Sequence, residues 1–188
     1  RWPLWAVPLS ERVKNDPPNC IKSARGHILL PPKDLYRNYI FQTVKHLKGR
    51  VPVYEIMNEP NLYLAPETYV DYLKVAHDAI RKADPAAKIS AFCVTSDFGA
   101  AATPWMQAAV KAGGLNYTDN IGFHPYGGRE LGSIRPADRY IADLRKEMRS
   151  YGKGDMPLWN TELYYLNPKS EGGSDAFSGP VFHPGWLA

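Results

Sequence analysis

The sequence predicts an α/β fold built on a parallel sheet, and three observations carry this prediction. Five short apolar runs, rich in β-branched and aromatic residues, alternate with four longer segments whose apolar side chains recur at helical spacing. The composition, with 44% hydrophobic and 22% charged residues, is that of an ordinary globular domain that buries a core. Repeated strand–helix units fold with parallel strands joined by right-handed crossovers.

In the first half of the chain, proline and glycine mark where the expected elements end. Pro8 closes the opening apolar run, and Gly49 suits the end of the first helix. Asp84 and Pro85 stop the second helix, because the residue before a proline is biased away from helical geometry. The expected elements are a strand at 2–7, a Pro- and Asn-rich loop at 11–25, helices at 32–47 and 66–83, and a strand at 51–57.

In the second half, glycines again end the expected helices. Gly113 and Gly114 close a short helix, and Gly152 caps a longer one. The runs between the helices are apolar and rich in β-branched residues, as buried strands are. The expected elements are strands at 88–95, 120–124 and 156–163, helices at 104–112 and 136–151, and a Gly-, Pro- and Ser-rich loop at 167–188.

Two architectures fit this alternation, a doubly wound open sheet and a barrel. A nucleotide-binding doubly wound sheet normally carries a glycine-rich turn after its first strand, and the sequence has no G-x-G-x-x-G motif. In both architectures the function lies at the carboxyl ends of the strands. The residues that follow each strand are therefore the candidates for a site.

Glu59, His124 and Glu162 each stand at the carboxyl end of an expected strand. A pair of carboxyl groups can cleave a glycosidic bond, because one protonates the leaving oxygen while the other acts at the anomeric carbon. The two groups lie about 5–5.5 Å apart in retaining enzymes and about 6.5–9.5 Å apart in inverting ones. A single glutamate after a strand is more often a solvated or ion-paired residue. Two of them, one within Asn-Glu-Pro-Asn, favour a catalytic pair.

Three segments resemble the catalytic motifs of clan A glycoside hydrolases. Val-Tyr-Glu-Ile-Met-Asn-Glu-Pro-Asn-Leu (53–62) resembles the fourth-strand motif, in which an Asn precedes the acid/base Glu. His-Pro-Tyr (124–126) resembles the sixth-strand His-x-Tyr, and Trp-Asn-Thr-Glu (159–162) resembles the seventh-strand nucleophile segment. Within the clan, Glu-Pro-Asn-Leu is most similar to glycoside hydrolase family 39, the family of β-xylosidases and α-L-iduronidases.

The resemblance implies that residues 1–188 form a single incomplete TIM-barrel catalytic domain, a partial (β/α)8 barrel. A whole barrel needs about 250 residues, so strands one, two and eight are expected outside this sequence. Two sheet edges would then lack partners, and the 188 residues alone are expected to aggregate or to be inactive. The clan's second-strand Arg and eighth-strand Trp are not identified, and Tyr54 and Met57 depart from the family's usual Trp and aromatic residue. By this resemblance, strands three to seven are 2–7, 51–57, 88–95, 120–124 and 156–163.

The resemblance also implies a role for each matched side chain. Glu59 would protonate the leaving group and then activate water, and Glu162 would attack to form a covalent glycosyl-enzyme. Asn58 would hydrogen-bond the sugar 2-hydroxyl, a contact that can strengthen in the transition state. Tyr126 would donate its hydroxyl to Glu162, and His124 would orient a carboxylate or line the sugar site.

Aromatic side chains near strand ends are candidates for platforms under sugar rings. Trp5 and Tyr164 are the two that we expect to serve in this way. Ordinary roles remain the alternatives: core packing for these two rings, turn chemistry for Asn58 and a structural role for His124.

The expected activity is that of a retaining glycoside hydrolase, which cleaves O-glycosidic bonds of poly- or oligosaccharides by double displacement. The expected partner is a carbohydrate substrate, and such substrates favour a secreted or periplasmic location. One alternative is a catalytically silent carbohydrate-binding barrel fragment. A distance between the two carboxyl groups well beyond that of an inverting pair, about 10 Å, would favour this alternative. The other is a doubly wound α/β hydrolase or nucleotide binder.

Other classes of protein find little support in the sequence. The net charge of +4 is scattered and mixed with acidic residues, which argues against a nucleic-acid partner. No apolar run approaches the ~20 residues of a membrane span. Cys20 and Cys93 do not make a disulfide framework. Neither H-E-x-x-H, paired C-x-x-C nor G-x-S-x-G occurs, so no metal, other cofactor or serine triad is expected.

Overall fold

A computed structural model of the chain describes residues 20–23, 26–95, 102–124 and 135–162. The expected strand at 2–7 and the expected loop at 167–188 lie outside these ranges, as do Trp5, Tyr126 and Tyr164.

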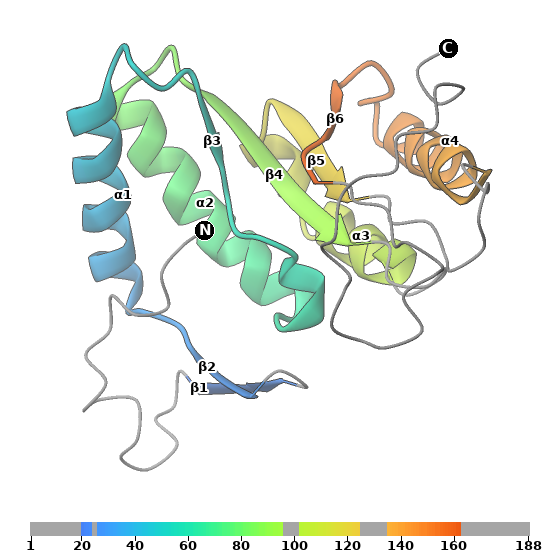
Figure 1. The fold of residues 1–188 in the computed structure, drawn as a ribbon, viewed down its shortest axis with the longest axis horizontal. Helices are drawn as coiled ribbons and strands as arrows, with labels where there is room; N and C mark the ends of the chain where they lie inside the picture. Colours follow the sequence, from blue (N-terminus) through green and yellow to red (C-terminus); the bar gives the residue numbers. More distant parts are fainter. Residues whose placement is uncertain (1–19, 24–25, 96–101, 125–134, 163–188) are drawn as a thin grey trace, which may run out of the picture.

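Four parallel strands form the sheet of the described residues. Their order in the sheet is β3-β4-β5-β6, which is also their order in the chain (Figure 1). Each connection between these four described strands therefore moves one strand further in the same direction, as in a barrel, and among them the order does not reverse as it does at the centre of a doubly wound sheet. The strands are β3 (Val53–Glu55), β4 (Lys88–Thr95), β5 (Asn120–His124) and β6 (Leu158–Asn160).

The helices of the described residues lie where the apolar spacing predicts them. In α1 the buried residues Tyr36, Ile40 and Val44 recur at three- and four-residue spacing, which defines one helix face. Pro66 opens α2 at its first position, and Asp84 ends it while donating its backbone N–H to Ile80. The helices are α1 (Lys33–Leu47), α2 (Pro66–Ala83), α3 (Ala102–Lys111) and α4 (Arg135–Ser150), with 3-10 turns η2 (Pro60–Leu62) and η4 (Gly114–Tyr117). No described helix is both long and apolar enough to cross a membrane.

A β-hairpin replaces part of the loop that the sequence predicts at 11–25. Strands β1 (Cys20–Ser23) and β2 (Gly26–Leu29) pair antiparallel and lie apart from the parallel sheet (Figure 1). The Pro- and Asn-rich composition of the stretch hides this hairpin, because its strands have only four residues each.

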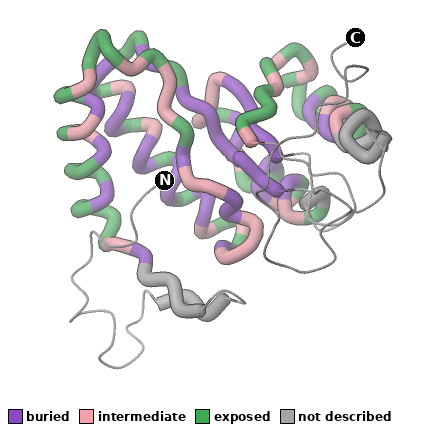
Figure 2. Tube along the Cα trace, viewed as in Figure 1, coloured by how far each residue is buried: buried purple, intermediate pink, exposed green. Residues whose placement is uncertain are grey.

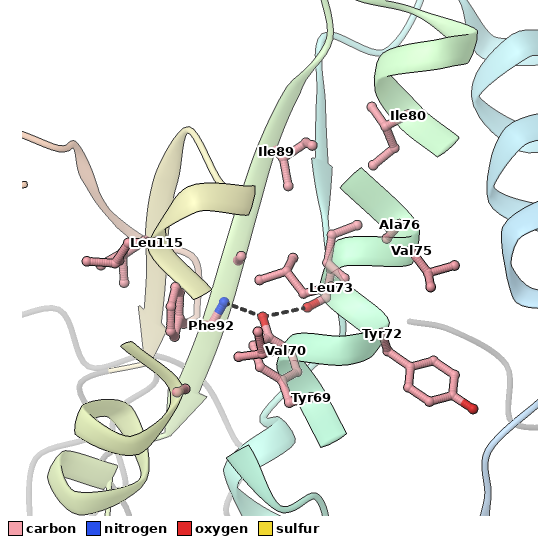
Figure 3. Close-up of a cluster of buried hydrophobic side chains, with 14 of the residues drawn as sticks. Tyr69, Val70, Tyr72, Leu73, Val75, Ala76, Ile80, Ile89, Phe92 and Leu115 are labelled. Atoms are coloured by element: carbon pink, nitrogen blue, oxygen red, sulfur yellow. Dashed lines mark hydrogen bonds between the residues drawn. The ribbon is translucent and has the colours of Figure 1, made fainter. Parts of the chain in front are cut away.

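The main core lies between α2 and the sheet (Figure 3). Tyr69, Leu73 and Ile80 of α2 are fully buried against residues such as Ile89 and Phe92 of β4. Buried residues run along β4 and β5 and along one side of α1 (Figure 2). This apolar layer fixes one face of the sheet.

A β-bulge in β4 changes which side chains face the core. Phe92 and Cys93 both have positive φ, 73° and 43°, and the register with β5 shifts between Phe92 and Val94. The Phe92 ring joins the helix-facing core, while the Cys93 sulfur lies with Ser90 on the opposite face, next to Gly122. The bulge thus re-phases the strand, so that Thr95 pairs with His124 at its carboxyl end.

Asp119 ties the amino ends of β4 and β5 together. Its Oδ2 accepts hydrogen bonds from Arg81 Nη2 at 2.7 Å and from the Ile89 backbone N–H at 2.8 Å, and Lys88 Nζ lies 3.8 Å from Oδ1. Burial alone would raise the pKa of Asp119, but the hydrogen bonds from Arg81 and Ile89 and the charges of Arg81 and Lys88 outweigh it and lower the pKa. This cluster stabilises the end of the sheet opposite to the candidate site.

Candidate active site

Glu59, His124 and Glu162 meet at the carboxyl ends of the parallel strands. His124 Nδ1 lies 3.2 Å from Glu59 Oε1 and 3.9 Å from Glu162 Oε2. The three residues each offer an oxygen or nitrogen atom, and these three atoms all lie within 4.8 Å of one another. The two carboxylates, about a hundred residues apart in sequence, therefore face each other across a gap of a few ångströms.

The three side chains differ in their access to solvent. The His124 side chain is 1% exposed and that of Glu59 is 11% exposed, whereas that of Glu162 is 41% exposed. An attacking carboxylate has to be reachable by a substrate, and Glu162 is the more exposed of the two glutamates. The asymmetry thus fits two carboxylates with different roles.

The loop after β3 holds Glu59 in a left-handed backbone conformation, with φ 49°. Its backbone N–H donates to the carbonyl of Cys93 at 3.0 Å, which attaches the loop to the bulge of β4. Two residues later, the Asn61 amide accepts a hydrogen bond from the Thr95 N–H at 3.2 Å and donates one to the Thr95 carbonyl at 3.1 Å. These contacts compensate for the strained φ of Glu59 and fix the direction of its side chain.

Asn58 lies half-buried directly before Glu59. Its carbonyl accepts a hydrogen bond from the Tyr63 hydroxyl at 3.0 Å. Burial, with smaller effects from Cys93 and Glu59, raises the pKa of Tyr63 to about 12, so this hydroxyl remains a donor at physiological pH. The loop that carries Asn58 and Glu59 is therefore braced from both sides.

Thr161 also lies at the site. It belongs to the motif at 159–162, but the sequence predicts no role for it. Its Oγ1 lies 3.2 Å from His124 Nε2, and its backbone N–H donates to the carbonyl of Phe123 at 3.2 Å. The only sequence signal for it is its place directly before Glu162.

A polar layer lies beneath this group, on the face of the sheet away from α2. A Cβ placed on Gly122 would come within 2.6 Å of Cys93 Sγ, 3.1 Å of Ser90 Oγ and 3.3 Å of Thr161 Oγ1. Gly122 therefore makes room for three polar side chains that a larger residue would displace. Burial raises the pKa of the Cys93 thiol well above its ordinary value, and the thiol is neutral at physiological pH.

The Glu59, His124 and Glu162 group also has the residue types that bind transition metals. A zinc ion holds its ligand atoms at about 2.0–2.2 Å, so two ligands of one ion lie at most about 4.4 Å apart. The three atoms lie within 4.8 Å of one another, and the shortest contact in the group is a hydrogen-bonded pair at 3.2 Å. The arrangement in this structure is that of a hydrogen-bonded group.

Comparison with known proteins supports the barrel architecture. No protein-family model and no curated protein sequence matches the chain. Among solved structures, a glucosidase from Croceicoccus marinus is similar with a TM-score of 0.55 and 20% identity, over 71% of this chain and 31% of the other. A family 39 glycoside hydrolase from Bacteroides cellulosilyticus has a TM-score of 0.51 and 23% identity, over 72% and 31%.

A family 39 β-xylosidase from Caulobacter crescentus is similar to the same degree, with a TM-score of 0.51 and 22% identity over 72% of this chain and 32% of the other. The chain thus spans about a third of the length of these structures. At this level of identity the likeness concerns the fold, which is a partial (β/α)8 barrel of parallel strands alternating with helices.

Proposed function

We propose that this chain carries the catalytic pair of a retaining glycoside hydrolase, which cleaves O-glycosidic bonds of poly- or oligosaccharides through a covalent glycosyl-enzyme. The observation that carries the proposal is the approach of the Glu59 and Glu162 carboxylates to within 4.8 Å at the carboxyl ends of barrel strands. Retaining enzymes need about 5–5.5 Å between the two carboxyl groups, whereas inverting enzymes need a wider gap that admits a water molecule. The order of the two glutamates along the chain supports the same assignment.

In this proposal the two carboxylates divide the reaction between them. Glu162, the more exposed of the two, attacks the anomeric carbon, while Glu59 gives its proton to the departing oxygen. In the second step Glu59 takes a proton from water, the water oxygen bonds to the anomeric carbon, and the bond to Glu162 breaks. His124 lies beside both carboxylates and orients them, and Asn58 is the candidate partner of the sugar 2-hydroxyl.

A catalytically silent carbohydrate-binding barrel is the second candidate. Carboxyl groups separated by well over the inverting distance, about 10 Å, would favour it, and the observed approach is much closer. The sheet order argues against the doubly wound alternative, because the four parallel strands that the structure describes follow one another without the reversal that forms a nucleotide crevice.

The test is hydrolysis of a panel of aryl glycosides by a protein in which this chain is completed to a whole barrel, as wild type and as the variants Glu162→Gln and Glu59→Gln. We expect Glu162→Gln to lose turnover on every substrate. The turnover of Glu59→Gln should fall about 10²–10⁴-fold on glycosides with poor leaving groups. It should fall much less on glycosides with activated leaving groups, since these need little protonation.

Glu67→Gln, an exposed glutamate in the first turn of α2, is the matched control and should leave hydrolysis unchanged. Undiminished hydrolysis by Glu162→Gln would reject the assignment of the nucleophile. An inverted configuration in the first sugar product, read by NMR, would reject double displacement.

A further inference from the structure

We propose that Tyr63 is a positioning residue, which sets the orientation of the Asn58–Glu59 peptide and thereby holds Glu59 in place for proton transfer. The effect on catalysis rests on the proposed function. The orientation of the peptide does not, since it is a property of the folded chain.

Both ends of the Asn58–Glu59 peptide are hydrogen-bonded. At one end, the Tyr63 hydroxyl donates to the Asn58 carbonyl at 3.0 Å. At the other end, the Glu59 N–H donates to the carbonyl of Cys93 at 3.0 Å. The peptide is trans, so its carbonyl and its N–H point in opposite directions and the two contacts hold it from opposite sides. Together they fix how the peptide plane is turned, which sets ψ of Asn58 and φ of Glu59.

The orientation that these contacts hold is one that Glu59 disfavours by itself. Its φ of 49° and ψ of 50° lie in the left-handed region, which is costly for a residue with a Cβ. Pro60 follows, and a residue before a proline favours extended backbone. Turning the peptide over would move φ of Glu59 towards that extended region, but it would break both hydrogen bonds. The two contacts therefore hold the peptide against a local preference.

Tyr63 can hold the peptide because its own backbone and ring are fixed. Its N–H donates to the Pro60 carbonyl at 3.1 Å, and its ring packs against the hydrophobic core. A carbonyl only accepts hydrogen bonds, so the hydroxyl is the donor to Asn58. With its pKa raised to about 12, the hydroxyl keeps its proton at physiological pH. The contact with Cys93 is between backbone groups, so the Tyr63 hydroxyl is the one of the two that a substitution can remove.

Loss of this hydroxyl should displace the Glu59 carboxylate. If the peptide turns, the bond to the Cys93 carbonyl breaks, and this bond ties Glu59 to the bulge of β4. The carboxylate would then leave its position beside His124, where Oε1 lies 3.2 Å from Nδ1. A misplacement of about 1 Å can lower a rate about 100-fold. Because Glu59 is the proposed proton donor, the loss should depend on how much protonation the leaving group needs.

The kinetic test compares Tyr63→Phe with the wild type in a protein in which this chain is completed to a whole barrel. The ratio kcat/KM reports the first step, in which the leaving group departs. We expect it to fall about tenfold on aryl glycosides with poor leaving groups and to change little on activated ones. A smaller fraction of folded protein would lower it on every substrate alike, so equal losses over the whole panel overturn the proposal.

Tyr72→Phe is the matched control. The Tyr72 hydroxyl also donates to a backbone carbonyl, that of Pro31, at 2.6 Å, but this contact lies outside the loop that carries Glu59. In urea unfolding the two variants should lose stability to a similar extent. Tyr72→Phe should nevertheless hydrolyse the whole panel as the wild type does.

NMR of the same proteins, labelled with nitrogen-15 glutamate, gives a readout that needs no activity. At positive φ the amide and α protons of a residue lie on the same side of the N–Cα bond, so the NOE between them is strong. We expect a strong NOE at Glu59 in the wild type and in Tyr72→Phe, stronger than at the helical Glu67, and a weaker one in Tyr63→Phe. The Glu59 signal is identified by its absence from the spectrum of Glu59→Gln.

The outcomes separate the two proposals. If the wild type hydrolyses nothing but the NOE at Glu59 weakens in Tyr63→Phe, the glycosidase function is rejected and the hold of Tyr63 on the peptide is supported. If the wild type hydrolyses the panel and Tyr63→Phe matches it in both measurements, the role of Tyr63 alone is rejected. If Tyr63→Phe does not fold, the wild-type spectrum decides, because a weak NOE at Glu59 overturns the proposal and a strong one supports it.

Discussion

The side-chain amide of Asn61 pairs with the backbone of Thr95 through two hydrogen bonds, as a further strand residue would. Asn61 Nδ2 donates to the Thr95 carbonyl at 3.1 Å, and the Thr95 N–H donates to Asn61 Oδ1 at 3.2 Å. β3 ends at Glu55, before Asn61. The Asn61 amide therefore attaches the loop that follows β3 to the end of β4. Glu59 lies in the loop between Glu55 and Asn61. The position of Glu59 at the site therefore depends on Asn61, a residue that need not touch a substrate.

Asn61→Ala should displace Glu59 and destabilise the chain. The buried Thr95 N–H and carbonyl would lose their partners, at about 1–3 kcal/mol for an unsatisfied group. We expect kcat to fall up to about 100-fold with KM little changed, since a misplacement of about 1 Å costs that much. Urea unfolding measures the first effect and hydrolysis the second. Asn116→Ala, at an exposed position of η4, should change neither.

Tyr69→Phe should destabilise the bulge of β4. The Phe92 N–H, turned out of the strand ladder by its positive φ, donates to the Tyr69 hydroxyl at 2.6 Å, and both residues are fully buried (Figure 3). Removing the hydroxyl leaves a buried N–H without this partner, so the free energy of unfolding should fall by about 1–3 kcal/mol. Hydrogen exchange of the Phe92 amide should become faster. Equal stability of Tyr69→Phe and the exposed control Tyr151→Phe would contradict this prediction.

The sequence predicts the positions of the described helices and the extent of β4 because their signals are local, whereas β3 and β6 are shorter than the strands expected at 51–57 and 156–163. The apolar spacing of α2 and the proline and aspartate at its ends give its bounds, and the β-branched run of β4 gives its extent. The bulge at Phe92 and Cys93 leaves no such trace, since neither residue type favours positive φ. The hairpin of β1 and β2 is too short to be distinguished from the surrounding loop.

The site divides in the same way. Glu59, His124 and Glu162 can be predicted, because each is a polar residue directly after an apolar run and parallel strands bring their carboxyl ends together. Thr161, Asn61 and the gap at Gly122 cannot be predicted in this way, since their roles come from contacts with residues far along the chain. The roles of Trp5, Tyr126 and Tyr164, which lie outside the described residues, stay predictions.

Asp119→Asn should cost stability at neutral pH and much less in acid. The folded-state pKa of Asp119 is lowered, so its carboxylate stabilises the fold above the unfolded-state value of about 3.9. That contribution disappears as the pH falls through the lower folded-state pKa. Urea unfolding at pH about 7 should therefore separate wild type from Asp119→Asn by about 1–3 kcal/mol, and the difference should shrink steadily below the pH of unfolded aspartate, about 3.9.

Asp71→Asn is the matched control for this prediction. Asp71 binds Lys33 at 2.7 Å, the same distance as Asp119 from Arg81, but its side chain is 64% exposed. Exposed ion pairs contribute about 0–1 kcal/mol, so the free energy of unfolding should fall less in Asp71→Asn than in Asp119→Asn. Equal losses in the two variants would show that burial and the backbone hydrogen bond at Asp119 do not matter.

Cys93 should react with iodoacetamide only when the chain opens. The residue is fully buried, and its raised pKa keeps the thiolate, the reactive form, scarce. In a Cys20→Ser background Cys93 is the remaining thiol. Its labelling rate in native buffer should be lower than its rate in urea, by about tenfold for every 1.4 kcal/mol of free energy needed to open the chain. Labelling in native buffer as fast as in urea would contradict the burial of the thiol.

Gly122→Ala should destabilise the polar layer beneath the carboxylates, and the loss should depend on Cys93. The added Cβ would lie 2.6 Å from Cys93 Sγ, closer than real contacts allow, and 3.3 Å from Thr161 Oγ1. Overpacking of this kind costs about 1–3 kcal/mol. Because sulfur makes the closest contact, Cys93→Ala should give the new methyl room, and the double variant should be more stable than the sum of the two single losses predicts. Strict additivity in this double-mutant cycle would mean that the cost of Gly122→Ala does not arise from the contact with Cys93.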